Sequence, residues 1–176
     1  MVQIFELLTS KVTSKLLCYF LKHPTTGIYA EKLLKEVKMA KKSLFDSLAK
    51  LEGEGYLISQ HFGRTKSYSL NREDPRVKQL KRLLIVSELM PKLKELKGSV
   101  EIYIYGSTAR GEDTETSDID LLVIGKIERE KLMQVLKNIS PERLKPVVMN
   151  SLEYSRLSRT DKAFYERIEK DKIRLV

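Results

Sequence analysis

One segment, residues 101–125, constrains the fold of this chain more than any other. Its sequence is EIYIYGSTARGEDTETSDIDLLVIG. Apolar and other residues alternate over residues 100–105, and this period of two predicts a strand with one covered face. Gly106 and Ser107 then interrupt the alternation, as a tight turn requires, and residues 108–110 can begin a short helix. The segment therefore predicts a strand, a glycine-serine turn, an acidic loop and a second strand.

Two carboxylates stand at the beginning of the second predicted strand. Asp118 and Asp120 are two residues apart, so their side chains are expected to leave the strand on the same face. Such a pair suits Mg²⁺ or Mn²⁺, and the ion in turn holds the phosphates of a substrate. Ser107 and the first N–H groups of the short helix can face an anion. The alternative is that the turn and the aspartates only mark a hairpin, which explains each feature separately but not their combination.

The form GSTARG, and the ten residues between Ser107 and Asp118, make this segment similar to the DNA polymerase β-type nucleotidyltransferases, in particular the minimal nucleotidyltransferases. The resemblance implies that Gly106 and Ser107 hold the triphosphate of an NTP. It also implies that Asp118 and Asp120 bind the catalytic metal ions. Arg110 fits the local pattern and is expected to bind the nucleotide and neutralise developing charge.

The third strand departs from the family pattern. Active members usually carry a third carboxylate there, whereas residues 145–151, KPVVMNS, contain none. Glu142 and Glu153 flank this strand without standing at the expected place. Loss of a general base typically costs about a hundred- to ten-thousandfold in rate, so turnover is handicapped more than binding. Two functions stay open: a DNA-binding regulator that binds a Mg²⁺-nucleotide, and an active enzyme that transfers NMP from an NTP to a hydroxyl of a protein or nucleic acid.

The first half of the chain predicts a separate domain. Helical spacing of apolar residues predicts helices at residues 3–22, 29–38 and 41–54, followed by a hairpin of residues 56–61 and 66–70. This order resembles the winged helix-turn-helix domains of MarR- and ArsR-like proteins. The resulting expectation is an α+β chain: a winged-helix domain at residues 1–73, a linking helix at 74–97, and a nucleotidyltransferase-like mixed sheet with helices at 98–176.

The charge distribution favours a nucleic-acid partner for the first half. Residues 1–98 hold 19 Lys and Arg against 10 Asp and Glu, whereas residues 99–176 hold 14 of each. The third helix would be the recognition helix in the major groove, with the hairpin against the DNA backbone. The alternative is that these polar groups merely solvate an exposed face. The residues predicted to contact DNA are Lys41, Lys42, Ser43, Ser47, Lys50, Arg64 and Lys66.

The linking helix has a broad apolar face, and Pro91 is expected to kink or divide it. That face can pack between the domains or pair with its copy in a homodimer, and both readings stay open. Gly98 and Ser99 mark the predicted domain boundary.

The remaining second half predicts helices at residues 128–138, 151–158 and 161–170, and strands at 146–149 and 173–176. Ser151 is expected to cap the middle helix. Cys18 is the single cysteine and is expected to be buried among apolar neighbours. No apolar run approaches the roughly 18 residues of a membrane span, and the first 22 residues do not resemble a secretory signal. A cytoplasmic protein without membrane partners is therefore expected.

Overall fold

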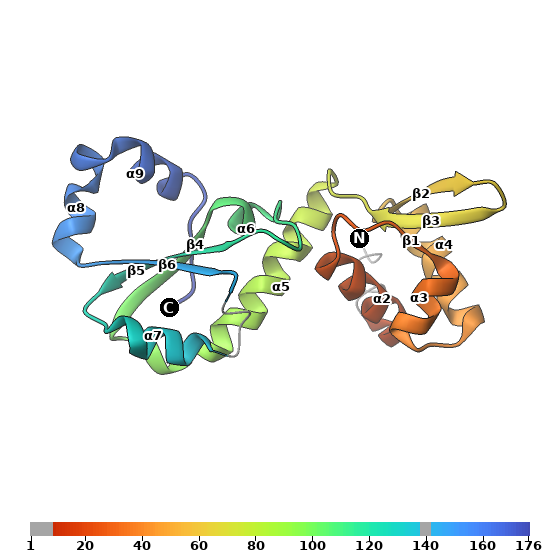
Figure 1. Ribbon diagram of the computed structural model, residues 1–176, viewed down its shortest axis with the longest axis horizontal. Coiled ribbons are helices and arrows are strands. Elements are labelled where there is room, and N and C mark those ends of the chain that lie inside the picture. Colours follow the sequence, from red (N-terminus) through yellow and green to blue (C-terminus); the bar gives the residue numbers. More distant parts are fainter. Residues whose placement is uncertain (1–8, 138–141) are drawn as a thin grey trace. The chain divides into compact units, whose positions relative to one another are not determined.

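The computed structural model describes residues 9–137 and 142–176 (Figure 1). It divides the chain into two compact units, Met1–Lys78 and Gln79–Val176. The division lies within helix α5 (Pro75–Leu93), so that most of the predicted linking helix belongs to the second unit. Within the described ranges, no helix combines the length and the apolar character that a bilayer crossing requires.

Within the described residues, the N-terminal unit contains the three helices α2, α3 and α4 and a small antiparallel sheet of order β1-β3-β2. Leucine side chains from all three helices lie in its core, together with Phe20 and Tyr56. The paired strands β2 and β3 are joined through Gly63, whose φ of +60° places it in the left-handed region. The elements are α2 (Lys11–Lys22), β1 (Ile28–Tyr29), α3 (Ala30–Val37), α4 (Lys41–Gly53), β2 (Leu57–Phe62) and β3 (Thr65–Leu70).

The predicted continuous helix over residues 3–22 is wrong at Ser10. Ser10 has extended backbone angles, and its hydroxyl accepts a hydrogen bond from the N–H of Thr13 at 3.3 Å. It is therefore the N-cap of α2, because a serine side chain satisfies an amide that the first turn leaves unpaired. Residues 3–8 of the predicted helix lie outside the described part of the chain.

Two residues face the opposite way from their prediction. Ser47, predicted to reach DNA, is only 6% exposed, and its hydroxyl lies 3.2 Å from that of Thr13 on α2. This contact pairs two buried hydroxyls between α4 and α2, so Ser47 stabilises the helix packing and does not lie on the outer face. Cys18, expected to be buried, is exposed.

The C-terminal unit is built on a mixed sheet of order β6-β5-β4-β7, in which β5 and β6 are parallel and the other pairs are antiparallel. Of the two predicted effects of Pro91, a kink or a division, the division does not occur, because helix α5 continues through Pro91 to Leu93. A short 3₁₀ turn (Lys94–Leu96) follows. The remaining elements are β4 (Val100–Tyr105), α6 (Gly106–Arg110), β5 (Ile119–Gly125), α7 (Arg129–Leu136), β6 (Leu144–Met149), α8 (Ser151–Thr160), α9 (Lys162–Glu169) and β7 (Ile173–Arg174).

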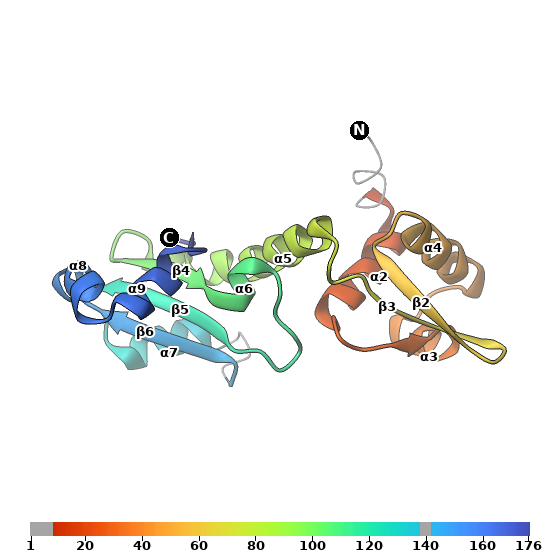
Figure 2. The ribbon, with the colours of Figure 1, turned by 90° about the horizontal axis from the view of Figure 1, so that it is seen from above.

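Side-chain alternation gives this sheet two covered faces. Ile104 and Leu121 project toward one core, which includes Leu89 of α5 and Leu132 of α7. The strand residues of opposite parity, among them Tyr105, Leu122 and Ile124, join Leu157 of α8 and Ile168 of α9 in a second core. Figure 2 shows α8 and α9 crossing one face of the sheet, with α7 on the other side. The parity of a strand residue therefore decides which pair of helices it meets.

The N-cap of α8 is Asn150 and not the predicted Ser151. The Asn150 side chain accepts from the N–H of Glu153, and the Glu153 carboxylate accepts from the N–H of Asn150. This reciprocal capping box engages Glu153 at the beginning of the helix. The end of the predicted helix at residues 128–138 differs as well, because α7 ends at Leu136 and Asn138 lies outside the described residues.

Candidate functional site

The turn between β4 and α6 brings the backbone of Gly106 next to a carboxylate. Gly106 has a φ of +73°, a conformation that disfavours side chains. A Cβ at this position would lie 2.7 Å from Oδ2 of Asp120, well inside van der Waals contact. Tyr105, the residue before the turn, is paired with Asp120 across the antiparallel strands. Glycine is therefore required both for the turn and for the approach of the acid to the backbone.

Asp118 and Asp120 belong to the same face of the sheet. Ile119 between them is buried in the core beneath α5 and α7, so the two aspartates project toward the side of α8 and α9. Asp118 lies directly before β5 with 55% of its side chain exposed, 3.9 Å from the Lys145 ammonium. The buried hydroxyl of Thr108 donates to its backbone carbonyl at 3.1 Å and fixes this end of the strand to α6.

The two carboxylates affect each other electrostatically. Burial raises the pKa of Asp120, and the charge of Asp118 raises it further, while Arg167 acts in the opposite direction. Among the described residues, no hydrogen-bond donor reaches the Asp120 carboxylate. A partly desolvated, repelled carboxylate favours either a proton or a bound cation. A divalent ion at this place would therefore stabilise the arrangement.

An internal carboxylate occupies the anion-binding groups of the turn. The Gly106 N–H donates to Oδ1 of Asp171 at 3.3 Å, and Arg110 Nη1 donates to Oδ2 of the same residue at 2.6 Å. Arg110 also donates through Nε to Glu112 at 2.7 Å. The two groups predicted to meet a phosphate, an amide and a guanidinium, thus already hold an anion. Asp171 was not foreseen from the sequence.

Arg167 of α9 is a second residue near the site that was not foreseen. Its guanidinium lies 5.0 Å from the ring centroid of Phe164, which packs edge to face on Tyr105 at 6.1 Å. Its charge acts to lower the pKa of Asp120, against the effects of burial and of Asp118. An exposed cation on the same face as the aspartates is suited to a phosphate.

The acidic loop that leads to Asp118 is held by two cations. Lys81 of α5 has a side chain only 3% exposed, and its ammonium donates to the Asp113 carbonyl at 2.5 Å and lies 3.0 Å from the Asp113 carboxylate. Arg143 donates to the carbonyls of Ser117 at 2.8 Å and Thr114 at 3.3 Å. These contacts tie the backbone of the loop to α5 and to the beginning of β6.

The two aspartates suit a metal ion that is bound by the protein and by a phosphate at the same time. In the described ranges, no cluster of three or more His, Cys, Asp or Glu forms a metal cage. Of the two acids that flank β6 in the sequence, Glu142 is exposed and Glu153 is engaged in its capping box. Mg²⁺ typically takes one or two carboxylates and completes its shell with water and phosphate oxygens. Asp118 and Asp120, beside a glycine that leaves room for the second of them, match this pattern.

The residues predicted to contact DNA all lie in the N-terminal unit, but they differ in how far their side chains are exposed to solvent. Lys41 and Lys42 are exposed in the first turn of α4, and Ser43 and Lys50 are half-buried. Ser47 faces inward, as described above.

The two predicted hairpin contacts also differ. Arg64 is exposed in the turn between β2 and β3. Lys66 instead forms an ion pair with Glu52 of α4 at 2.6 Å, and Ser59 donates to the same carboxylate at 2.5 Å. Lys66 therefore ties the hairpin to α4.

Comparison with known proteins places the C-terminal unit. A search of curated proteins finds no match. A crystal structure of a "putative nucleotidyltransferase" from Sulfolobus solfataricus is similar at 21% sequence identity, over 58% of this chain and 88% of that chain, with a TM-score of 0.36. The family model described as "Nucleotidyltransferase domain" matches residues 86–175, just over half of the chain. This match covers the glycine-serine turn, both aspartates and α9, and the chain belongs to the nucleotidyltransferase domain family.

Proposed function

We propose that the C-terminal unit binds an NTP together with Mg²⁺ or Mn²⁺, and that the N-terminal unit is a winged helix-turn-helix that binds DNA. On this proposal the protein is a DNA-binding, transcription-regulatory protein that responds to a nucleotide. The observation that carries the nucleotide site is the position of the Asp120 carboxylate beside the Gly106 turn, where a Cβ on residue 106 would lie only 2.7 Å from Oδ2 of Asp120.

The proposed roles follow from the positions of the side chains. Asp118 and Asp120 hold the metal ion, which when bound neutralises phosphate charge and orients the phosphates. The turn at Gly106 and Ser107 receives the phosphate chain, and Arg167 supplies a cation from α9. Because Asp171 already accepts from the Gly106 amide, an incoming phosphate must exchange with this carboxylate.

The proposal favours binding over turnover. An enzyme of this kind would attach the α-phosphate of the NTP to an acceptor hydroxyl and release pyrophosphate, and the acceptor would have to lose its proton. Among the described residues, no third acid forms a metal-holding group with Asp118 and Asp120, and the Asp171 carboxylate at the turn is engaged by the Gly106 amide and Arg110. The retained aspartate pair and the glycine-serine turn still favour the enzyme as the second candidate function.

Replacement of both site aspartates is expected to abolish nucleotide binding. Asp118→Asn/Asp120→Asn keeps the size of the side chains but removes both negative charges, so the affinity for Mg²⁺-NTP falls at least about 10- to 100-fold. The measurement is calorimetric titration of each of the four NTPs with and without Mg²⁺. Because burial and the charge of Asp118 raise the pKa of Asp120, protons compete with the ion, and the affinity of the parent protein is expected to decrease as the pH falls toward that raised pKa.

The matched control is Glu130→Gln, which removes a negative charge from α7 on the other side of the sheet. Its NTP affinity is expected to equal that of the parent protein, and equal binding by the double aspartate variant would contradict the nucleotide site. The same proteins are incubated with NTPs labelled at the α-phosphate and with DNA, RNA or protein acceptors. Transfer of label that is lost only in the aspartate variant establishes the enzyme instead of the regulator.

The groups proposed to bind DNA all belong to the N-terminal unit. Its third helix, α4, begins with the exposed Lys41 and Lys42, and the β2–β3 hairpin places Arg64 in its turn. Three helices followed by a hairpin fit the arrangement in which one helix enters the major groove. The positive excess of residues 1–98 supplies the attraction to phosphates.

Lys41→Ala/Lys42→Ala is expected to lower the affinity for duplex DNA and to make that affinity less dependent on salt concentration. If each lysine neutralises one phosphate, the slope of log K against log salt becomes less steep by roughly 1.8. Fluorescence anisotropy with a labelled duplex, from about 50 to 200 mM salt, measures this slope. Lys11→Ala/Lys22→Ala removes the same charge from α2 as a control. If both double variants change the salt slope equally, the attraction to DNA is a general effect of positive charge, and this result would contradict a recognition helix at α4.

A further inference from the structure

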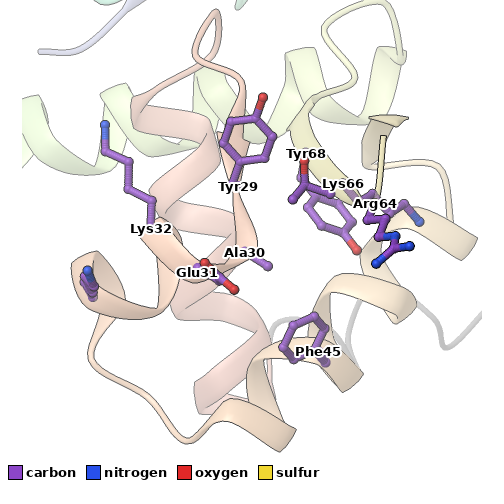
Figure 3. A pocket seen from close by; sticks show the side chains of 10 residues that line it. Tyr29, Ala30, Glu31, Lys32, Phe45, Arg64, Lys66 and Tyr68 are labelled. Atoms are coloured by element: carbon purple, nitrogen blue, oxygen red, sulfur yellow. The ribbon is translucent and has the colours of Figure 1, made fainter. Parts of the chain in front are cut away.

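A cavity of about 580 Å³ lies within the N-terminal unit, between the beginning of α3, the outer side of α4 and the β2–β3 hairpin. Figure 3 shows Tyr29, Glu31 and Phe45 on its helical side and Arg64 and Tyr68 on its hairpin side. Its volume falls in the range of pockets that hold small molecules or single groups of a polymer. The duplex-binding proposal uses Arg64 but leaves the rest of this cavity without a role.

Aromatic rings are exposed around the cavity. Tyr29 is 43% exposed and Phe45 is 42% exposed, although Phe45 stands in the middle of a helix whose neighbouring face is packed. Phe62 of β2, 53% exposed, lies edge to face with Tyr29 at 6.2 Å between ring centroids. The exposure of three large rings on one side of a small unit costs solvation free energy and is typical of a binding surface.

Cations accompany these rings. Lys32 and Lys35 of α3 and Arg64 of the hairpin line the cavity, and in the described part of the chain none of the three forms an ion pair. Glu31 is the one acid among the lining residues. In Figure 3 the Glu31 side chain points into the space near Phe45, whereas the Lys32 ammonium points away from it. The cavity therefore combines an aromatic and acidic interior with a basic margin.

We propose that this cavity receives an unpaired base of single-stranded nucleic acid. Flat apolar rings with nearby cations suit this ligand, since bases stack on aromatic side chains while lysine and arginine neutralise the backbone. Phe45 and Tyr29 stack on the base, and Arg64, Lys32 and Lys35 meet the flanking phosphates. Glu31 accepts a hydrogen bond from an exocyclic amino group, as acidic side chains do from cytosine, so cytosine and adenine are preferred over thymine or uracil.

The test compares single strands with a duplex on the full chain. Fluorescence anisotropy is measured at low salt with labelled oligo(dC), oligo(dT), oligo(rC), oligo(rU) and a hairpin duplex. Phe45→Ala and Tyr29→Ala are each expected to weaken oligo(dC) binding by about 5- to 150-fold, the range for loss of one stacked base. Phe45→Tyr retains the affinity, whereas Phe45→Leu, apolar without a ring, behaves as the alanine variant. Glu31→Gln removes the preference for dC over dT. The deoxy and ribo oligomers tell DNA from RNA.

The controls keep this proposal separate from duplex binding. Ile58→Ala removes an exposed apolar side chain of β2 outside the cavity and is expected to leave single-strand affinity unchanged. Circular dichroism and thermal unfolding establish that each variant is folded. An unchanged affinity of Phe45→Ala for oligo(dC), or an equal loss for single strand and duplex, overturns the proposal. If Lys41→Ala/Lys42→Ala loses duplex binding but keeps oligo(dC) binding, the recognition helix and the cavity act independently. If this variant loses both duplex and oligo(dC) binding, single-strand binding belongs to the recognition helix, and the cavity proposal is overturned.

Discussion

Gly106→Ala is expected to weaken Mg²⁺-nucleotide binding strongly and to destabilise the fold. An alanine at a φ of +73° costs about 1–2 kcal/mol in the folded state. The added methyl group would also lie 2.7 Å from the Asp120 carboxylate, which must turn away from its position. Displacement of a metal-ligand side chain by such a disturbance typically reduces metal affinity by about 10- to 100-fold. Urea denaturation and calorimetric titration with Mg²⁺-NTP measure the two effects.

Gly98→Ala separates backbone strain from the clash. Gly98 has a φ of +85°, but no atom of the described chain lies within 4 Å of the Cβ that it would gain. We therefore expect a similar loss of unfolding free energy for Gly98→Ala, with unchanged nucleotide affinity. Equal nucleotide affinities for the two glycine variants would mean that the position of Asp120 beside the turn does not matter for binding.

Lys81→Met is expected to cause the largest loss of stability in the C-terminal unit. The lysine side chain is 3% exposed, and its ammonium is satisfied by the carbonyl and carboxylate of Asp113. Removal of one member of a buried pair leaves the other desolvated, at a cost of about 3–5 kcal/mol. We expect the lower end of this range, because Asp113 is 20% exposed and Arg143 lies 3.9 Å from its carboxylate. Urea denaturation gives the free energy of unfolding.

The same variant tests whether the acidic loop positions Asp118. Hydrogen exchange of residues 112–117 should become faster in Lys81→Met, and Mg²⁺-NTP affinity should decrease with it, because the loop loses its tie to α5. Lys162→Ala removes an exposed ion pair with Glu166 on α9 and serves as the control, with a cost of at most about 1 kcal/mol. Normal exchange in the loop of Lys81→Met would show that Arg143 alone holds it.

The strand-turn-strand around Gly106 could be predicted from sequence because its information is local. Alternation assigns each residue of β4 and β5 to a face, and Ile119 between two aspartates fixes their common direction. Asp171 and Arg167 could not be predicted. Asp171 follows Arg110 by 61 residues, and only the packing of α9 on the sheet brings it to the turn. No local pattern distinguishes Arg167 from the other charged residues of α9, or Asp171 from other acids in a turn.

The wrong predictions for Cys18 and Ser47 have a common cause. Cys18 is two residues from both Leu16 and Phe20, and residues two apart on a helix do not share a face. Ser47 is three residues after Leu44 and four before Leu51, so its spacing places it on the buried stripe. In both cases the type of residue was given more weight than its position. Thr13, which completes the buried hydroxyl pair with Ser47, is too distant in sequence to indicate this contact.

The order of the C-terminal sheet has a consequence for aggregation. Its outermost strands are β6 and β7, and an unprotected outer strand can recruit a strand from another molecule. In β6, Pro146 lacks an N–H and Lys145 brings an exposed charge, while β7 spans only Ile173–Arg174. Both borders thus present few consecutive donors to an incoming strand, and we expect this unit to resist growth into fibrils by strand addition.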